Sequence, residues 1–182
     1  MGRSKQLLEI EGGHLLLKTT QQAIDSEGEK VTVVLGANEL AHRKSIEHLA
    51  IEIVTNEEWQ QGMGGSLKKG LQKLLQLLPE MDAALVMVCD QPLLTTSHLN
   101  KLIHTFQQTK RPIIASYYSG TEGVPALFEK SLFKEMLILQ NEAGAKKIIQ
   151  QHRESVHVID FPEGAVDLDT PDDYQKFINR KN

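Results

Sequence analysis

An apolar run ends in polar residues at positions 86–92, Val-Met-Val-Cys-Asp-Gln-Pro. A strand buried on both faces reads as a continuous apolar run, and open α/β sheets bind ligands beyond the carboxyl ends of their strands. Asp90 is therefore our first candidate for a metal ligand. The single cysteine, Cys89, lies within the run, where we expect a buried structural thiol rather than a nucleophile.

A second group of carboxylates lies near the end of the sequence, at positions 167–173. Helix capping accounts for the residues from Thr170 onward, because Thr and Pro suit the start of a helix. It does not account for Asp167 and Asp169, which would project from the same face of an extended segment. Together with Asp90 they could bind a divalent cation through oxygen, the ligand atom that Mg²⁺ requires.

Two glycine-containing segments could contact phosphate or base. Gly2 and Lys5 lie near the start of the chain, and backbone amides beside a glycine can cradle phosphates together with a lysine. The alternative for that segment is a disordered tail. Gly64, Gly65 and Ser66 precede a helical leucine pattern and could present amides and a hydroxyl to a ligand. The alternative there is a simple loop with Ser66 as the helix N-cap.

Composition excludes several classes of protein. The 182 residues carry a net charge of -4, and the basic residues are spread along the chain, which argues against binding to a nucleic-acid duplex. The single cysteine cannot build a thiolate cluster, and the seven histidines form no HxxxH or HxH pair, so the sequence argues against a zinc site. Neither a run of the ~20 apolar residues that a membrane span needs nor a signal-peptide pattern is present, so we expect a cytoplasmic protein without membrane contact.

The elements that must position these residues alternate along the chain. Alternating strand-like and helix-like segments predict βαβ units and an α/β fold, which we expect to form a single domain over residues 1–182. The predicted strands are residues 31–35, 51–54, 83–89, 112–117 and 156–160, and helical patterns begin near Glu39, Ser66, Thr95, Lys130, Glu142 and Pro171. Thr95 or Thr96 is the expected cap of its helix, Trp59 a packing anchor, and residues 120–123 a loop tip.

Taken in order, these segments resemble the nucleotidyltransferases that make molybdenum cofactor dinucleotides, most closely the cytidylyltransferase branch. The family's loop LAAGxSxRMGxxKxLL is represented by Met1, Gly2, Lys5, Leu7 and Leu8. The other family motifs are represented by Asn56, Trp59, Gly62 and Met63, then Ser66-Leu67, then Asp90-Gln91-Pro92, then Gly123, Pro125 and Phe128, and finally residues 167–171.

The resemblance implies a three-layer αβα fold with a Rossmann-like, mostly parallel sheet of the nucleotide-diphospho-sugar transferase type. It also implies a Mg²⁺-dependent transfer of CMP from CTP to molybdopterin with release of pyrophosphate, and an acceptor molybdoenzyme or chaperone as a possible partner. In that reaction Lys5 and Asp90 would be catalytic. Gly2 and Lys5 would contact the triphosphate, and Gly64, Gly65 and Ser66 would lie near the base. Asp90 would hold Mg²⁺ with Asp167 or Asp169.

Two departures from the family pattern leave alternatives open. The sequence starts within the signature loop, so we expect that Met1 is an internal methionine and that the first strand and the rest of the loop lie upstream. Val124 stands where these enzymes often place a polar residue. The alternatives are guanylyl or other nucleotidyl transfer to a different phosphorylated acceptor, and a noncatalytic relative that binds nucleotide or hands a cofactor to a partner enzyme.

Overall fold

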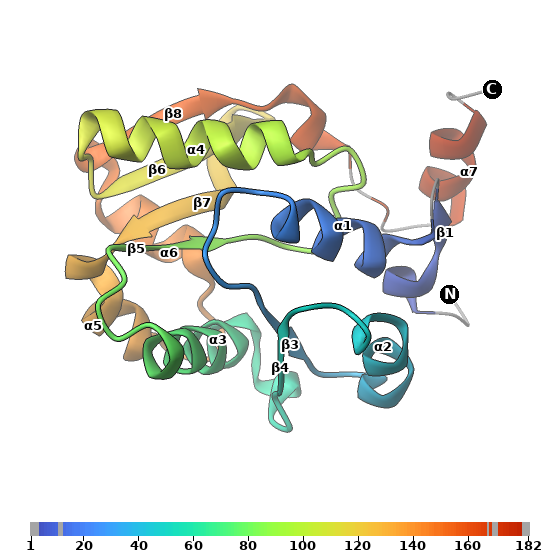
Figure 1. Ribbon diagram of the computed structural model, residues 1–182. Helices are drawn as coiled ribbons and strands as arrows, with labels where there is room; N and C mark the ends of the chain where they lie inside the picture. Colours follow the sequence, from blue (N-terminus) through green and yellow to red (C-terminus); the bar gives the residue numbers. More distant parts are fainter. Residues whose placement is uncertain (1–3, 11–12, 167, 169–170, 180–182) are drawn as a thin grey trace.

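The computed structural model describes residues 4–10, 13–166, 168 and 171–179 (Figure 1). The strands are β1 Glu9–Ile10, β2 Gly13–His14, β3 Thr32–Leu35, β4 Glu52–Thr55, β5 Ala83–Val86, β6 Ile113–Tyr118, β7 Thr121–Glu129 and β8 Val156–Asp160. The α-helices are α1 Leu15–Ile24, α2 Glu39–Ile46, α3 Met63–Leu77, α4 Thr96–Thr109, α5 Phe133–Leu137, α6 Ala145–Gln151 and α7 Pro171–Asn179. Short 3₁₀ helices include η1 Lys5–Leu7, η2 Trp59–Gln61 and η5 Pro162–Ala165.

The larger sheet has the strand order β5-β7-β6-β8. Strand β7 is antiparallel to both β5 and β6, and β8 is parallel to β6, so β5, β6 and β8 share one direction. Strands β3 and β4 form a separate parallel pair, in register from Thr32 opposite Glu52 to Leu35 opposite Thr55. The expected α/β fold with mostly parallel strands is confirmed.

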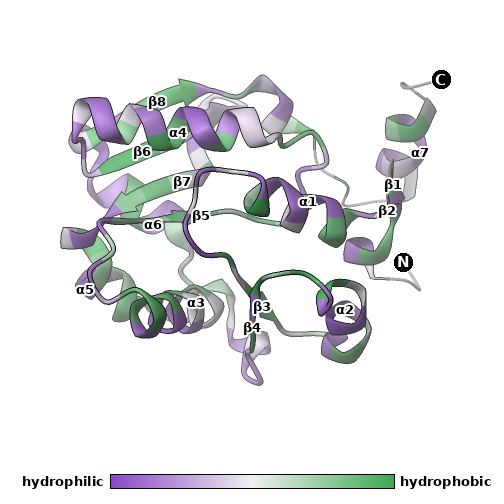
Figure 2. Cartoon of the chain, viewed as in Figure 1, coloured by the Kyte–Doolittle hydropathy of each residue, from purple (hydrophilic) through white to green (hydrophobic). Residues whose placement is uncertain are grey.

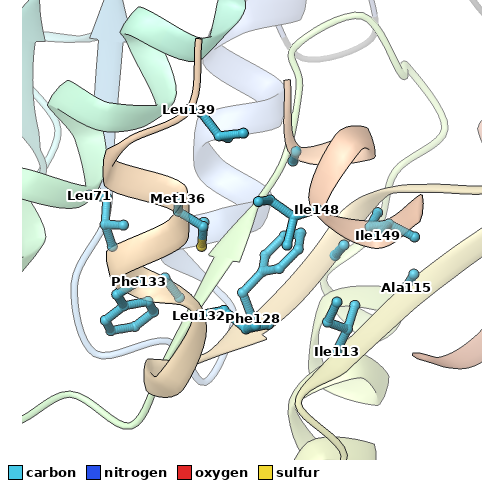
Figure 3. Close-up of a cluster of buried hydrophobic side chains, with 13 residues drawn as sticks. Leu71, Ile113, Ala115, Phe128, Leu132, Phe133, Met136, Leu139, Ile148 and Ile149 are labelled. Atoms are coloured by element: carbon cyan, nitrogen blue, oxygen red, sulfur yellow. The ribbon is translucent and has the colours of Figure 1, made fainter. Parts of the chain in front are cut away.

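Helices cover both faces of the larger sheet, because successive side chains of a strand point to opposite faces. On one face, Ile114 and Leu127 pack with Leu102 and Phe106 of α4. On the other, Ile113 and Phe128 belong to a larger cluster with residues of α3, α5 and α6 (Figure 3). Figure 2 shows that α4 is largely hydrophilic on the side turned away from the strands. The layers are therefore helix, sheet and helix, as expected.

Most predicted elements are present, but several differ from the prediction: the strand expected at residues 83–89 ends at Val86, and helix α1 and strand β7 were not predicted. Thr95 caps α4 as expected, since its hydroxyl oxygen accepts a hydrogen bond from the N–H of His98 at 3.3 Å. The expected loop tip at residues 120–123 is shorter than predicted, because strand β7 already begins at Thr121. Helix α3 begins at Met63, so Ser66 lies in its first turn and is not the N-cap. In the described part of the chain, no helix is both long and apolar enough to span a bilayer.

Helix α1 contacts α4 near one of its ends and the β3–β4 pair with α2 near the other. Its carboxyl end is attached to α4 by polar contacts: Thr96 donates its N–H to Gln22 Oε1 at 2.6 Å and its hydroxyl to the Gln22 carbonyl at 3.1 Å. In the following loop, the N–H of Glu27 donates to Asn100 Oδ1 at 2.9 Å. Leu16 of α1 packs with Leu35 and with residues of α2. The small β3–β4 unit is thus connected to α4 through one helix.

A buried histidine joins α4 to the larger sheet. Ser116 donates its hydroxyl to the carbonyl of Pro125 at 2.6 Å and lies 2.8 Å from His98 Nε2. The serine hydroxyl therefore accepts from His98, which is neutral with its proton on Nε2. The imidazole also stacks on Phe161 at a centroid distance of 4.1 Å. Burial, reinforced by the charge of Lys101, lowers the pKa of His98 to about 4.

This histidine makes stability depend on pH. Because the folded pKa lies below the unfolded value of 6.5, the unfolded chain binds more protons between pH 6.5 and 4. The contribution of neutral His98 is complete above pH 6.5 and is lost as the pH falls toward 4, a change of up to about 3 kcal/mol. Urea unfolding from pH 7 to pH 4 measures it. His98→Gln, which keeps a donor but does not titrate, should show a shallower decline, and equal slopes would contradict the assignment.

Candidate active site

The structure brings Asp90 and Lys5 together from distant parts of the sequence. Asp90 follows β5, and Lys5 begins η1. The Nζ of Lys5 donates to Asp90 Oδ2 at 3.1 Å, and the two side chains are 29% and 28% exposed. The pair is therefore accessible to solvent and to ligands. The family resemblance predicted that these two residues are catalytic.

The pair lines a cavity of about 1060 Å³. One wall is β3 with the residues that follow it, and another is the stretch from Ala84 to Asp90. Residues of α1, α3 and β7 complete it. Ser66 lines the same cavity, whereas Gly64 and Gly65 do not. The cavity is mainly apolar at the strands and polar near Lys5, Asn38 and Asp90, an arrangement typical of a small-molecule site.

Asn56 holds the hydroxyl of Ser66 in place. It is 1% exposed, and its Nδ2 donates to Ser66 Oγ at 3.0 Å. Its Oδ1 accepts from the N–H of Glu58 at 3.2 Å, and its own N–H donates to the carbonyl of Leu35 at 2.7 Å. Asn56 thus connects the end of β3, the loop before η2 and the first turn of α3. A buried amide with these partners fixes the orientation of Ser66.

Gly64 lies in close contact with the loop between α5 and α6. Its N–H donates to the carbonyl of Asn141 at 2.8 Å. A Cβ at position 64 would come within 2.3 Å of the Gln140 carbonyl oxygen and 2.5 Å of the Ala143 carbonyl oxygen. Nearby, Lys68 Nζ donates to Asn141 Oδ1 at 2.6 Å and strengthens the contact. Gly64 therefore allows α3 to approach the loop between α5 and α6.

Gln91 fixes the loop that carries Asp90. Its side chain is 4% exposed, and Nε2 donates to the carbonyl of Val124 at 3.1 Å and to that of Gly164 at 3.4 Å. These bonds attach the end of β5 to β7 and η5. The sequence motif Asp-Gln-Pro thus combines a partly exposed carboxylate with a buried anchor.

His42 and Cys89 also lie beside the charged pair. The Nε2 of His42 is 2.7 Å from Ser4 Oγ, and burial lowers the pKa of this histidine. Nothing in the sequence pattern marked His42, because its contact depends on the placement of α2. Burial, together with the neighbouring Asp90 carboxylate, raises the pKa of the Cys89 thiol to about 12. Cys89 is therefore a protonated, unreactive thiol, as expected.

Three predicted site residues lie outside the described residues: Gly2, Asp167 and Asp169. Leu168 is fully buried in a cluster with Ile10 and Leu15, against which Cys89 and Leu93 also pack. Leu168 therefore lies close to the residues that follow β5. Among the residues that the structure describes, no three His, Cys, Asp or Glu side chains gather in a group that could hold a metal ion.

Comparison with known proteins places the chain in a family. Residues 1–156 match the MobA-like NTP transferase domain, and the chain belongs to this nucleotidyltransferase family. The purine catabolism protein PucB of Bacillus subtilis (strain 168) is 24% identical over 196 residues, covering 96% of this chain and 87% of that protein.

Solved structures show the same fold. Rv0371c from Mycobacterium tuberculosis H37Rv has a TM-score of 0.82 and 23% identity, covering 98% of this chain and 91% of its own. A complex of Rv0371c with manganese has a TM-score of 0.78 and 23% identity, with 96% and 91% covered. A CMP:2-keto-3-deoxy-manno-octonic acid synthetase complexed with CTP has a TM-score of 0.70 and 9% identity, with 98% and 92% covered.

The packing at Gly64 yields a prediction for stability. Gly64→Ala should lower the free energy of unfolding by about 1–3 kcal/mol, because the added methyl group meets two carbonyl oxygens. Gly28→Ala is the matched control: its added Cβ would meet only Ser26 Oγ at 3.4 Å, and we expect a change within about 0.5 kcal/mol. Urea denaturation compares both variants with the parent protein. Equal midpoints for all three proteins would contradict the packing role.

Proposed function

We propose that this protein is a Mg²⁺-dependent cytidylyltransferase that transfers CMP from CTP to a molybdopterin-type acceptor and releases pyrophosphate. The observation that carries the proposal is the Lys5–Asp90 pair at the carboxyl end of β5, on the wall of a large cavity. The family assignment supports nucleotidyl transfer, and the resemblance of the sequence motifs to the cytidylyltransferase branch supports CTP and molybdopterin.

The residues present fit a divalent cation. Mg²⁺ commonly binds one or two carboxylates and completes its coordination with water and substrate phosphates. Asp90 supplies one accessible carboxylate at the cavity wall. The buried position of Leu168 supports Asp167 or Asp169 as a second ligand. The manganese in the Rv0371c structure is consistent with a divalent metal in this fold. When bound, the cation would neutralise charge on the triphosphate and on the departing pyrophosphate.

The reaction requires the protein mainly to align the two substrates and to neutralise the charge of their phosphates. A terminal phosphate oxygen of the acceptor forms a bond to the α-phosphorus of CTP while the bond from that phosphorus to the bridging oxygen of the β-phosphate breaks. The attacking phosphate is already an anion, so no side chain needs to remove a proton. Lys5 would reduce the repulsion between the two polyanions and stabilise charge on the leaving group.

The remaining side chains would position the nucleotide. Ser66, held by Asn56, offers a fixed hydroxyl on the cavity wall toward the base. Gly2 remains a proposed contact of the triphosphate, and Gly64 and Gly65 remain proposed contacts of the base. The packing of Gly64 against the loop at Asn141 would also fix where α3 begins. The apolar strands that form the other walls would exclude water from the reacting phosphates.

A direct assay tests the proposal. The purified protein is incubated with Mg²⁺ or Mn²⁺, with CTP, GTP or ATP, and with or without molybdopterin, and pyrophosphate and the dinucleotide product are measured. We expect release only when CTP, metal and acceptor are all present. Faster turnover with GTP would favour guanylyl transfer. Pyrophosphate release under none of these conditions would contradict the proposal and favour a noncatalytic nucleotide-binding protein.

Substitution of Asp90 separates its chemical role from its structural one. Asp90→Asn should lower the metal-dependent rate by about 100-fold or more, because the neutral amide no longer binds the cation. The melting temperature should change little, since a partly exposed ion pair contributes at most about 1 kcal/mol. Asp160→Asn, at the exposed end of β8, is the matched control and should retain full activity. A fully active Asp90→Asn variant would exclude Asp90 as the metal ligand.

A further inference from the structure

The hydroxyl of Ser4 joins the segment that carries Lys5 to helix α2. Ser4 occupies the N-cap position of η1, but its side chain makes no capping hydrogen bond. Its Oγ instead donates to Gln6 Oε1 at 2.5 Å and lies 2.7 Å from His42 Nε2. A hydroxyl has one proton, and Gln6 receives it. His42 is therefore the donor in its contact with Ser4, with a proton on Nε2.

Helix α2 holds His42 at a fixed position. The residue is 5% exposed, and Ile46, one turn later on the same face of the helix, is fully buried in a cluster with residues of α1 and β3. In addition, Arg43 donates from Nη2 to Thr55 Oγ1 at 3.1 Å and so attaches α2 to the end of β4. The Nε2 donor of His42 thus comes from a helix that is fixed by both apolar packing and a polar contact.

The segment that carries Lys5 is attached at its other end to α1. The N–H of Leu15, the first residue of α1, donates to the carbonyl of Leu8 at 3.0 Å. Lys5 lies between this attachment and Ser4, and its Nζ donates to Asp90 Oδ2 at 3.1 Å. A lysine ends in a flexible four-carbon stem, so the position of its charge depends on how well its backbone is held. Here a short segment is held on both sides of the lysine.

We propose that His42 is a positioning residue for Lys5: by donating to Ser4, it fixes the segment so that the lysine Nζ meets the phosphates that leave as pyrophosphate. The inference rests on the proposed function for the role of Lys5, and it adds a residue of α2 that touches neither substrate. Because alignment of charge is the main task of this site, loss of the donor should weaken binding of the triphosphate selectively.

Nucleotide binding by substituted proteins tests this role. His42→Leu keeps a similar volume but removes the donor, whereas His42→Gln places an amide donor at a reach similar to that of Nε2. Isothermal titration calorimetry with Mg²⁺ compares CTP with CMP, which lacks the two phosphates that Lys5 would contact. We expect His42→Leu and Ser4→Ala each to raise the Kd for CTP about tenfold and to leave the Kd for CMP unchanged. His42→Gln should restore most of the affinity for CTP.

A double-mutant cycle separates a shared hydrogen bond from two independent effects. The protein with both Ser4→Ala and His42→Leu should bind CTP no more weakly than either single variant, because each substitution removes the same contact. His48→Leu, at an exposed histidine just beyond α2, is the matched control and should bind CTP like the parent protein. Additive losses, equal losses for CTP and CMP, or parent-like CTP binding by both single variants would overturn the inference.

The reactivity of Lys5 supplies a readout that needs no nucleotide. Acetylation by acetic anhydride is followed at each lysine by peptide mass spectrometry. His42→Leu should speed the reaction at Lys5 by about two- to fivefold, the range that a loosened, partly exposed ion pair supports, and should leave the exposed Lys147 unchanged. Absence of CTP binding by the parent protein would contradict the proposed function, and the rate at Lys5 would then still decide the role of His42. An unchanged rate at Lys5 would overturn that role.

Discussion

The buried carboxamide of Gln91 is the contact on which the geometry of the site depends. It donates to the Val124 and Gly164 carbonyls and so attaches the segment after β5 to them. Because only 4% of Gln91 is exposed, water cannot replace these hydrogen bonds. The neighbouring Asp90 is consequently held at a fixed point while its carboxylate remains accessible. A rigid backbone beneath an exposed acidic group suits a site whose ligands are charged and must be aligned.

Local sequence patterns predicted the strands, helices and caps that depend on residues close together in the sequence. The apolar run at residues 83–89 begins as strand β5, which ends at Val86, and the leucines that follow Ser66 lie in helix α3. Thr95 caps the next helix because a hydroxyl and an exposed N–H lie three residues apart. Asp90 could be nominated because the end of a buried strand is where α/β folds bind ligands.

Contacts between distant segments could not be predicted in this way. Strand β7 contains Gly123 and Pro125, residues that normally indicate turns, and it forms because β5 and β6 flank it. The packing of Gly64 against the loop at Asn141 depends on how α3 meets α5 and α6. The pairing of Lys5 with Asp90 could be inferred only from the resemblance of the whole motif series, since no spacing rule links positions 85 residues apart.

The polar attachment of α1 to α4 has a consequence for how the protein opens. The large cluster around Phe128 unites three helices with one sheet, whereas the cluster of Leu16, Leu35 and Ile46 is small. Two helices join the β3–β4 unit to the rest. Helix α1 and the loop after it make contacts at Gln22 and Glu27 that can exchange with water, and α3 is tied to the unit by Asn56–Ser66 and Lys73–Glu52 contacts. Regions with few buried apolar contacts open below the global free energy of unfolding. Because few of its apolar residues are fully buried, we expect the β3–β4 region to open before the larger sheet does.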